Sequence, residues 1–218
     1  MFYIFFVVVN IYSTDYDYMG YTCPLCNNEF EYLGLVSFST AGARQNLDFR
    51  MIGNATNPAF VPQCPDCNFV FYNRLFTVDE IIILRHELEI NNIFEKEPNM
   101  PKNYYLARQL EIINRSITDI AWYFLSAVWE NKDDNLNLLL INITIDYINK
   151  INMTDTSYNN YQLVKLDLLR RSGRFDEALD LIEEIKLNNR FYVDYIIQII
   201  ELQANLIENM SQDEHQLP

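Results

Sequence analysis

Glycine and histidine are scarce in this chain of 218 residues, which contains five Gly and two His. Loops that bind phosphates need several glycines close together, and neither a P-loop nor a dinucleotide-binding fingerprint is present. The pair His86-Glu87 lacks the second histidine of a metalloprotease motif, and His215 lies in the C-terminal tail. A G-x-S-x-G serine motif is missing as well. These absences argue against the common motif-bearing enzymes.

Basic residues are also few: the chain has 16 Lys and Arg and 30 Asp and Glu, which gives a formal net charge of -14. Nucleic-acid binding depends on Lys and Arg that displace counterions from phosphates. An acidic surface likewise disfavours anionic membranes and other polyanions. We therefore expect no nucleic-acid partner.

No hydrophobic run reaches the ~20 residues that a membrane-spanning helix needs. The run from Phe2 to Val9 has the length of a signal-peptide core, but no Lys or Arg precedes it. It fits either an export signal or a buried strand that pairs with the cysteine region. A second run, Ile120 to Trp129, is bounded by Asp119 and Glu130 and predicts a buried core helix.

All four cysteines of the chain lie in two Cys-Pro-x-Cys turns, called knuckles below. Each knuckle can direct two thiolates to one point, and two knuckles make a tetrahedral sulfur site that suits zinc. The candidate zinc ligands are Cys23, Cys26, Cys64 and Cys67. A site with four protein ligands has no open position for a substrate, so the zinc would be structural.

The surroundings of the knuckles depart from the usual pattern in two ways. Asn27 and Asn68 stand where Gly is expected, and Asn is the next-best residue for a positive φ. The segment between the knuckles, residues 27–63, exceeds the usual ~15–20 residues, which a longer loop accommodates at little entropic cost. Within it, Asp48 and Arg50 could hold a ligand, but we expect them to pair with each other across the cysteine module.

Two alternatives to structural zinc stay open. Cys-x-x-Cys also occurs in thiol redox proteins, although there a single motif precedes a helix in a βαβ pattern. Each pair could close as a local disulfide in an oxidising compartment. A zinc enzyme would need an open coordination position and a base, and no histidine lies in the cysteine module.

The apolar pattern predicts an α+β chain, with a small zinc-ribbon-like β module before an all-α, tetratricopeptide-like helical domain. An acidic, Tyr-rich joint at 13–20 leads to the first knuckle, and alternation in Glu29–Phe38 predicts one or two strands. Further strands are expected at Phe60-Val61 and Phe69–Tyr72. The predicted parts are an N-terminal segment 1–20, a β module 21–76, a helical domain 77–210 and a tail 211–218.

The helical period begins at Thr77, where Thr77 and Glu80 have the spacing of a capping box. The first helix is expected to reach Phe94. Further helices are expected at roughly 103–115, 117–131, 134–150, 157–172, 175–188 and 191–210.

Residues 172–185 match the second half of a tetratricopeptide repeat. Gly173 would end one helix, and the small Ala178 would let the paired helix approach closely. Trp122 and Trp129 repeat the front half of the pattern earlier in the chain. Such repeats bind peptides or partner helices, so the expected partner is a protein or peptide. A generic amphipathic bundle is the alternative.

Several short motifs occur in a set order: Cys-Pro-Leu-Cys at 23–26, Leu47-Asp48-Phe49-Arg50, Asn57-Pro58-Ala59-Phe60, Cys-Pro-Asp-Cys at 64–67, Asn103-Tyr104-Tyr105-Leu106-Ala107, Ala121-Trp122 and Gly173-Arg174-Phe175. In this order they resemble a bacterial family of uncharacterised proteins, domain of unknown function 2225, over about Tyr21 to Leu206. The resemblance implies a zinc-ribbon-like module joined to a tetratricopeptide-like domain, and it implies no activity. The family usually has Gly at the positions of Asn27 and Asn68.

Residues 1–20 lie outside this resemblance. An added targeting segment, and with it an exported or cell-envelope location, is therefore favoured over a cytoplasmic one. Taken together, the patterns predict a non-enzymatic, zinc-stabilised interaction or scaffold protein. A thiol redox protein or zinc enzyme that uses the Cys-x-x-Cys pairs is the alternative.

Overall fold

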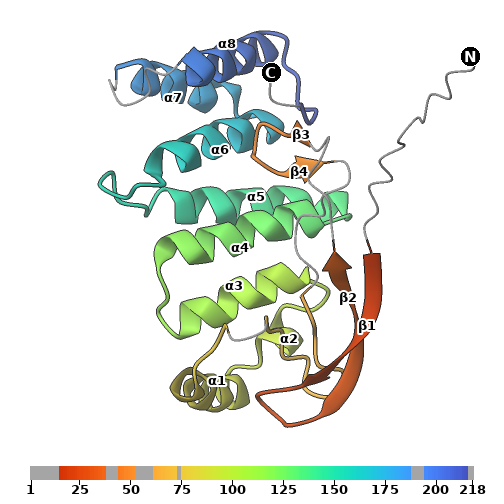
Figure 1. The fold of residues 1–218 in the computed structure, drawn as a ribbon. Coiled ribbons are helices and arrows are strands. Elements are labelled where there is room, and N and C mark those ends of the chain that lie inside the picture. The colour runs from red at the N-terminus through yellow and green to blue at the C-terminus, as the bar shows by residue number, and fades with distance from the viewer. Residues whose placement is uncertain (1–14, 38–43, 53–60, 73–74, 188–193, 216–218) are drawn as a thin grey trace, which may run out of the picture.

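A β hairpin opens the described part of the chain, and a stack of helices follows it (Figure 1). The computed structural model describes residues 15–37, 44–52, 61–72, 75–187 and 194–215. The predicted α+β class, with a small β part before a helical domain, is confirmed. The apolar run from Phe2 to Val9 lies outside the described residues.

The hairpin consists of β1 (Asp15–Thr22) and β2 (Glu29–Ser37), with the first knuckle at its turn. The strands pair antiparallel, and Tyr21 lies opposite Phe30. The strand predicted at Glu29–Phe38 is confirmed. The joint predicted at 13–20 was wrong for residues 15–20, which belong to β1. Their alternation of Asp and Tyr has the period of two that a strand needs, and aromatic residues favour strands.

The second knuckle has little sheet around it. An isolated bridge between Gln63 and Val70 is the only ladder that flanks it among the described residues. The strand predicted at Phe69–Tyr72 was therefore wrong, and Phe60 lies outside the described part. Pro62 and Pro65 have no N–H group, so this segment cannot complete a regular ladder. Between the knuckles, β3 (Arg44–Gln45) pairs with β4 (Met51–Ile52).

Helices occupy most of the remaining chain, and their bounds agree closely with the predicted ones. The first predicted helix is divided in two, because Asn91 ends one helix and the side chain of Asn92 caps the next. The helices are α1 (Val78–Ile90), α2 (Ile93–Lys96), α3 (Lys102–Ile112), α4 (Ile117–Glu130), α5 (Asp134–Ile148), α6 (Tyr158–Arg171), α7 (Phe175–Leu187) and α8 (Asp194–Glu208).

Local signals set the helix ends. Thr77 and Glu80 form the predicted capping box at the start of α1. Gly173 has a φ of 75° and ends α6 as predicted. There the Arg174 N–H donates to the Leu169 carbonyl at 2.9 Å and the Gly173 N–H to the Arg170 carbonyl at 3.0 Å. This pair of bonds is a Schellman motif, which favours glycine at the left-handed position.

Packing in the helical domain is mainly between neighbours in the sequence. Helices α3, α4, α5, α6 and α7 pack each on the next, and α8 contacts both α6 and α7. Ala178 is fully buried in α7, as a close helix pair requires. A stack of local contacts is the arrangement of helical repeats. The tetratricopeptide assignment itself stays a prediction. No helix among the described residues has the length and apolar character to cross a membrane.

The carboxyl group of Glu80 in this capping box has a lowered pKa. Burial opposes ionisation of Glu80, but hydrogen bonds from Thr77 and the Arg115 guanidinium outweigh it, so the pKa of Glu80 lies below its ordinary value. The Thr77 N–H donates to Glu80 at 2.8 Å, and Arg115 Nε lies 2.8 Å from Glu80 Oε1. The ionised carboxylate therefore stabilises the folded state.

We expect Glu80→Gln to lower the free energy of unfolding by about 1 kcal/mol at neutral pH. A lowered folded pKa contributes stability that is present above the unfolded pKa of about 4.3 and is lost as the pH falls through the folded pKa. The difference between wild type and variant should therefore shrink below about pH 4. Urea denaturation at a series of pH values measures it, and a difference independent of pH would contradict the prediction.

Candidate metal centre

The two knuckles have the same backbone structure. In the first, the Cys23 N–H donates to the Asn28 carbonyl at 2.8 Å and the Asn27 N–H to the Cys23 carbonyl at 2.9 Å. In the second, the N–H groups of Cys64 and Asn68 make the equivalent bonds at 2.9 and 3.0 Å. Asn27 and Asn68 have φ values of 61° and 59°, as predicted. Each knuckle is thus a fixed turn that aims two sulfurs to one side.

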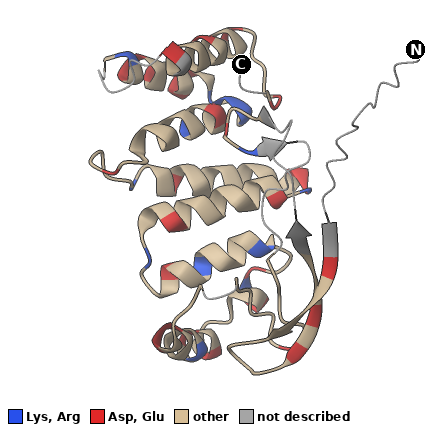
Figure 2. Ribbon diagram, in the orientation of Figure 1, with Lys and Arg blue, Asp and Glu red and all other residues tan. Residues whose placement is uncertain are grey.

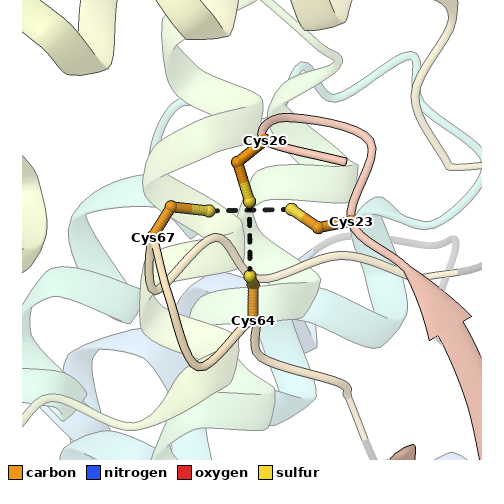
Figure 3. A group of neighbouring side chains, drawn as sticks. All are labelled: Cys23, Cys26, Cys64 and Cys67. Atoms are coloured by element: carbon orange, nitrogen blue, oxygen red, sulfur yellow. Dashed lines mark hydrogen bonds between the residues drawn. The ribbon is translucent and has the colours of Figure 1, made fainter. Parts of the chain in front are cut away.

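The four cysteine sulfurs meet at one place (Figure 3). All four Sγ atoms lie within 4.8 Å of one another. Across the two knuckles, Cys23 Sγ lies 3.6 Å from Cys67 Sγ, and Cys26 Sγ lies 3.6 Å from Cys64 Sγ. The predicted convergence of the two knuckles is confirmed, and these four residues could hold a metal ion.

The sulfur spacing fits a tetrahedral metal better than a disulfide. A disulfide would bring two sulfurs to about 2.05 Å. A tetrahedral ion with metal–sulfur bonds of about 2.3 Å places its ligands about 3.8 Å apart. The observed 3.6 Å is close to the second value. All four cysteines are free thiols.

The environment of the thiols differs from one to the next. Cys23 and Cys64 are buried, Cys67 is half-buried and Cys26 is exposed. Burial raises the pKa of Cys23 to about 11 and raises the pKa of Cys67 as well. Burial also disfavours the Cys64 thiolate, but the N–H groups of Cys67 and Asp66 outweigh it and lower the pKa of Cys64. Four thiolates at one point repel each other, so a cation is needed to hold them ionised together.

Aromatic rings that flank the knuckles in the sequence pack together and join the two knuckles. Phe71 contacts Tyr21 and Phe30 of the hairpin, with ring centroids 6.0 and 6.1 Å apart. Phe71 also stacks on Phe69, which follows the second knuckle. On the other side, Arg85 of α1 donates to the Leu25 carbonyl at 2.8 Å. The knuckles are therefore fixed to each other by aromatic packing and to the helices by α1.

The loop between the knuckles is pinned in the helical domain by Asp48. This carboxylate is fully buried and accepts hydrogen bonds from Trp129 Nε1 of α4 and Arg171 Nη1 of α6, both at 2.8 Å. Arg50 pairs with Glu214 of the C-terminal segment, and Glu214 also lies 3.2 Å from Arg171. The expectation that Asp48 and Arg50 pair with each other was wrong for their side chains, because Asp48 binds residues of α4 and α6 and Arg50 binds Glu214 of the C-terminal segment. Only the backbone N–H of Arg50 donates to Asp48, at 3.2 Å.

A second buried charged pair lies next to Asp48. Arg170 bonds Asp167 at 2.7 Å and donates to Gln203 of α8 at 2.9 Å. Burial and the nearby Asp48 carboxylate raise the pKa of Asp167, although both arginines oppose this. The result is one polar network that joins the inter-knuckle loop, α4, α6, α8 and the C-terminal segment. Nothing in the spacing of these residues along the sequence indicated it.

The two histidines lie apart from the cysteines. His86 is exposed on α1 beside Glu87, and His215 contacts Ser211. The cysteine cluster is the only group of metal-ligating side chains close enough to share an ion among the described residues.

Comparison of the chain with protein-family models, curated proteins and solved structures found no match. The resemblance to domain of unknown function 2225 therefore stays a prediction.

The positive φ of the knuckle asparagines leads to a first prediction for the site. Asn27→Ala and Asn68→Ala should each lower the free energy of unfolding by about 1 kcal/mol, because a side chain with Cβ disfavours the left-handed region. Asn27→Gly and Asn68→Gly should lower the free energy of unfolding by no more than a few tenths of a kcal/mol. Chemical denaturation measures this, with Asn137→Ala in α5 as control. Equal losses for Ala and Gly would refute the backbone explanation.

The Asp48 network leads to a second prediction. Asp48→Asn should lower the free energy of unfolding by about 3 kcal/mol, since it leaves the buried Arg171 without its closest carboxylate. It should also change the fluorescence of Trp129, which donates to Asp48. The exposed Asp180→Asn is the matched control and should have no measurable effect. A stability like that of the wild type would show that the network is not needed.

Proposed function

We propose that this protein is a non-enzymatic interaction or scaffold protein in which structural zinc stabilises a small β module that packs on a helical stack. Cys23, Cys26, Cys64 and Cys67 would hold the ion. The observation that carries the proposal is the meeting of four sulfurs from two equivalent knuckles at tetrahedral spacing. Bound zinc would neutralise the thiolates and cross-link two distant parts of the chain.

The number of sulfur ligands also favours a structural role for the zinc ion. They fill a tetrahedral coordination sphere, so a substrate or an activated water would find no position. The remaining surface supports protein binding rather than nucleic-acid binding. Acidic residues are spread over the hairpin and the helices, and no stripe of Lys and Arg appears on the described residues (Figure 2). The family resemblance agrees with this architecture, and like the zinc it belongs to the proposal.

Metal content and thiol reactivity test the proposal together. We expect one tightly held zinc per chain and four thiols that react with Ellman's reagent only after a strong chelator is added. Element analysis of purified protein and a thiol titration with and without chelator measure both. A protein without metal that forms a reversible disulfide within either knuckle would instead indicate a thiol redox function.

Cysteine variants separate the β module from the helices. Cys23→Ser and Cys64→Ser should each lose zinc and unfold the knuckle region, because three thiolates bind the ion far more weakly. The helices should keep most of their far-ultraviolet circular dichroism, since their contacts are mainly with each other. Full retention of zinc and thermal stability in both variants would contradict a structural metal.

A further inference from the structure

The two ends of the helical stack differ in character. Helix α8 closes one end (Figure 1), and its exposed residues are mostly polar: Gln198, Glu201, Asn205 and Glu208, with Ile197 37% exposed. Helix α1 closes the other end with exposed aliphatic residues: Val78, Ile82, Ile83 and Ile90 are 78, 58, 46 and 62% exposed. The terminal elements of a stack normally carry a polar outer face for solubility. The exposed face of α1 is therefore a candidate interaction surface.

A hollow of about 670 Å³ lies beside this face. It is bounded by α1 and α2 on one side and by both knuckles on the other. Apolar side chains that line it are the buried Leu88 and the half-buried Leu25 and Phe94. Because residues 78, 82, 85 and 89 follow helical spacing, Val78 and Ile82 share one side of α1 with the hollow's Arg85 and Glu89. Ile83 and Ile90 lie on the adjoining side of α1. Val78, Ile82 and the hollow together are called the docking groove below.

The charge of the groove indicates what it binds. The acids Asp66, Glu89 and Glu95 are exposed at the hollow. Among the described residues that line it, Arg85 is the one cation, and it donates to the Leu25 carbonyl. An apolar floor with acidic surroundings complements a ligand whose apolar residues are flanked by Lys or Arg. An amphipathic helix of the ligand that lies along α1 would present its apolar and basic residues at the same helical spacing as the residues of α1.

We propose that the groove between α1, α2 and the knuckles docks a basic amphipathic helix of a partner protein. A second copy of this chain fits less well, because each copy carries a formal net charge of -14 and the groove acids would face like charges. The proposal rests on the proposed function, since the zinc-bound knuckles would form one wall of the groove. It also assigns a place to the partner, at the β module rather than along the other helices.

A model peptide tests this on the full-length, zinc-loaded protein. The probe is a helical Leu/Lys peptide about five turns long, and a Leu/Glu peptide of the same pattern is its control. Fluorescence anisotropy should show binding of the Leu/Lys peptide only. Ile82→Glu should weaken it about tenfold, because the buried aliphatic contact is lost. Glu89→Gln should weaken it about threefold.

Two control variants distinguish docking from general attraction to an acidic protein. Leu138→Glu in α5 adds the same charge at a similarly exposed position, and Glu201→Gln in α8 removes the same charge. Both should leave peptide affinity unchanged. Equal effects of site and control variants would overturn the proposal, because non-specific attraction depends only on net charge.

Two further measurements complete the test. Sedimentation of the free protein should show monomers. If the protein instead self-associates and Ile82→Glu dissociates it, the groove binds a second copy of this chain, and the proposal of a partner helix is overturned. Zinc is measured in the same samples. A zinc-loaded, folded protein that binds no Leu/Lys peptide overturns the docking groove and leaves the structural zinc intact, whereas a protein without zinc overturns the proposed function itself.

Discussion

Two short turns that are far apart in the sequence bring four sulfur atoms to one point, and the β part of the protein depends on this convergence. The hairpin β1–β2 alone would be marginally stable, since two strands bury little surface. A metal ion bound by both knuckles would close the loop of residues 27–63, which by loop entropy would stabilise the folded state by about 4 kcal/mol. The aromatic rings around Phe71 add contacts that require both knuckles in place.

The loop between the knuckles does not stay within the β part. Its Asp48 carboxylate is buried among Trp129, Arg171 and the C-terminal segment, so the middle of the loop belongs to the helical domain in structural terms. Buried charges add less stability than their short distances suggest, because desolvation opposes them. They do require correct partners, however, and thus fix how loop, helices and C-terminal segment lie relative to one another.

The two parts of the protein meet at the cysteine cluster. Four sulfur donors lie together there, and α1 contacts the first knuckle through Arg85. Where the two parts meet, the knuckles and α1 enclose an acidic hollow next to exposed aliphatic residues. Under the proposed function, a metal that fixes the knuckles would thereby shape the docking groove.

Local signals in the sequence determined the helix bounds, the capping box at Thr77, the glycine end of α6 and the left-handed asparagines of the knuckles, because each depends on a few neighbouring residues. The Cys-Pro-x-Cys spacing also predicted that the sulfurs meet, since two fixed turns can satisfy one ion. The strand at 15–20 and the missing ladder at Phe69–Tyr72 also have local causes, the alternation of Asp and Tyr and the residues Pro62 and Pro65. The tertiary structure alone decided the partners of Asp48. Those partners lie far away in the sequence, such as Arg171, which comes 123 positions after Asp48, and no local pattern predicts which distant charge a buried carboxylate will contact.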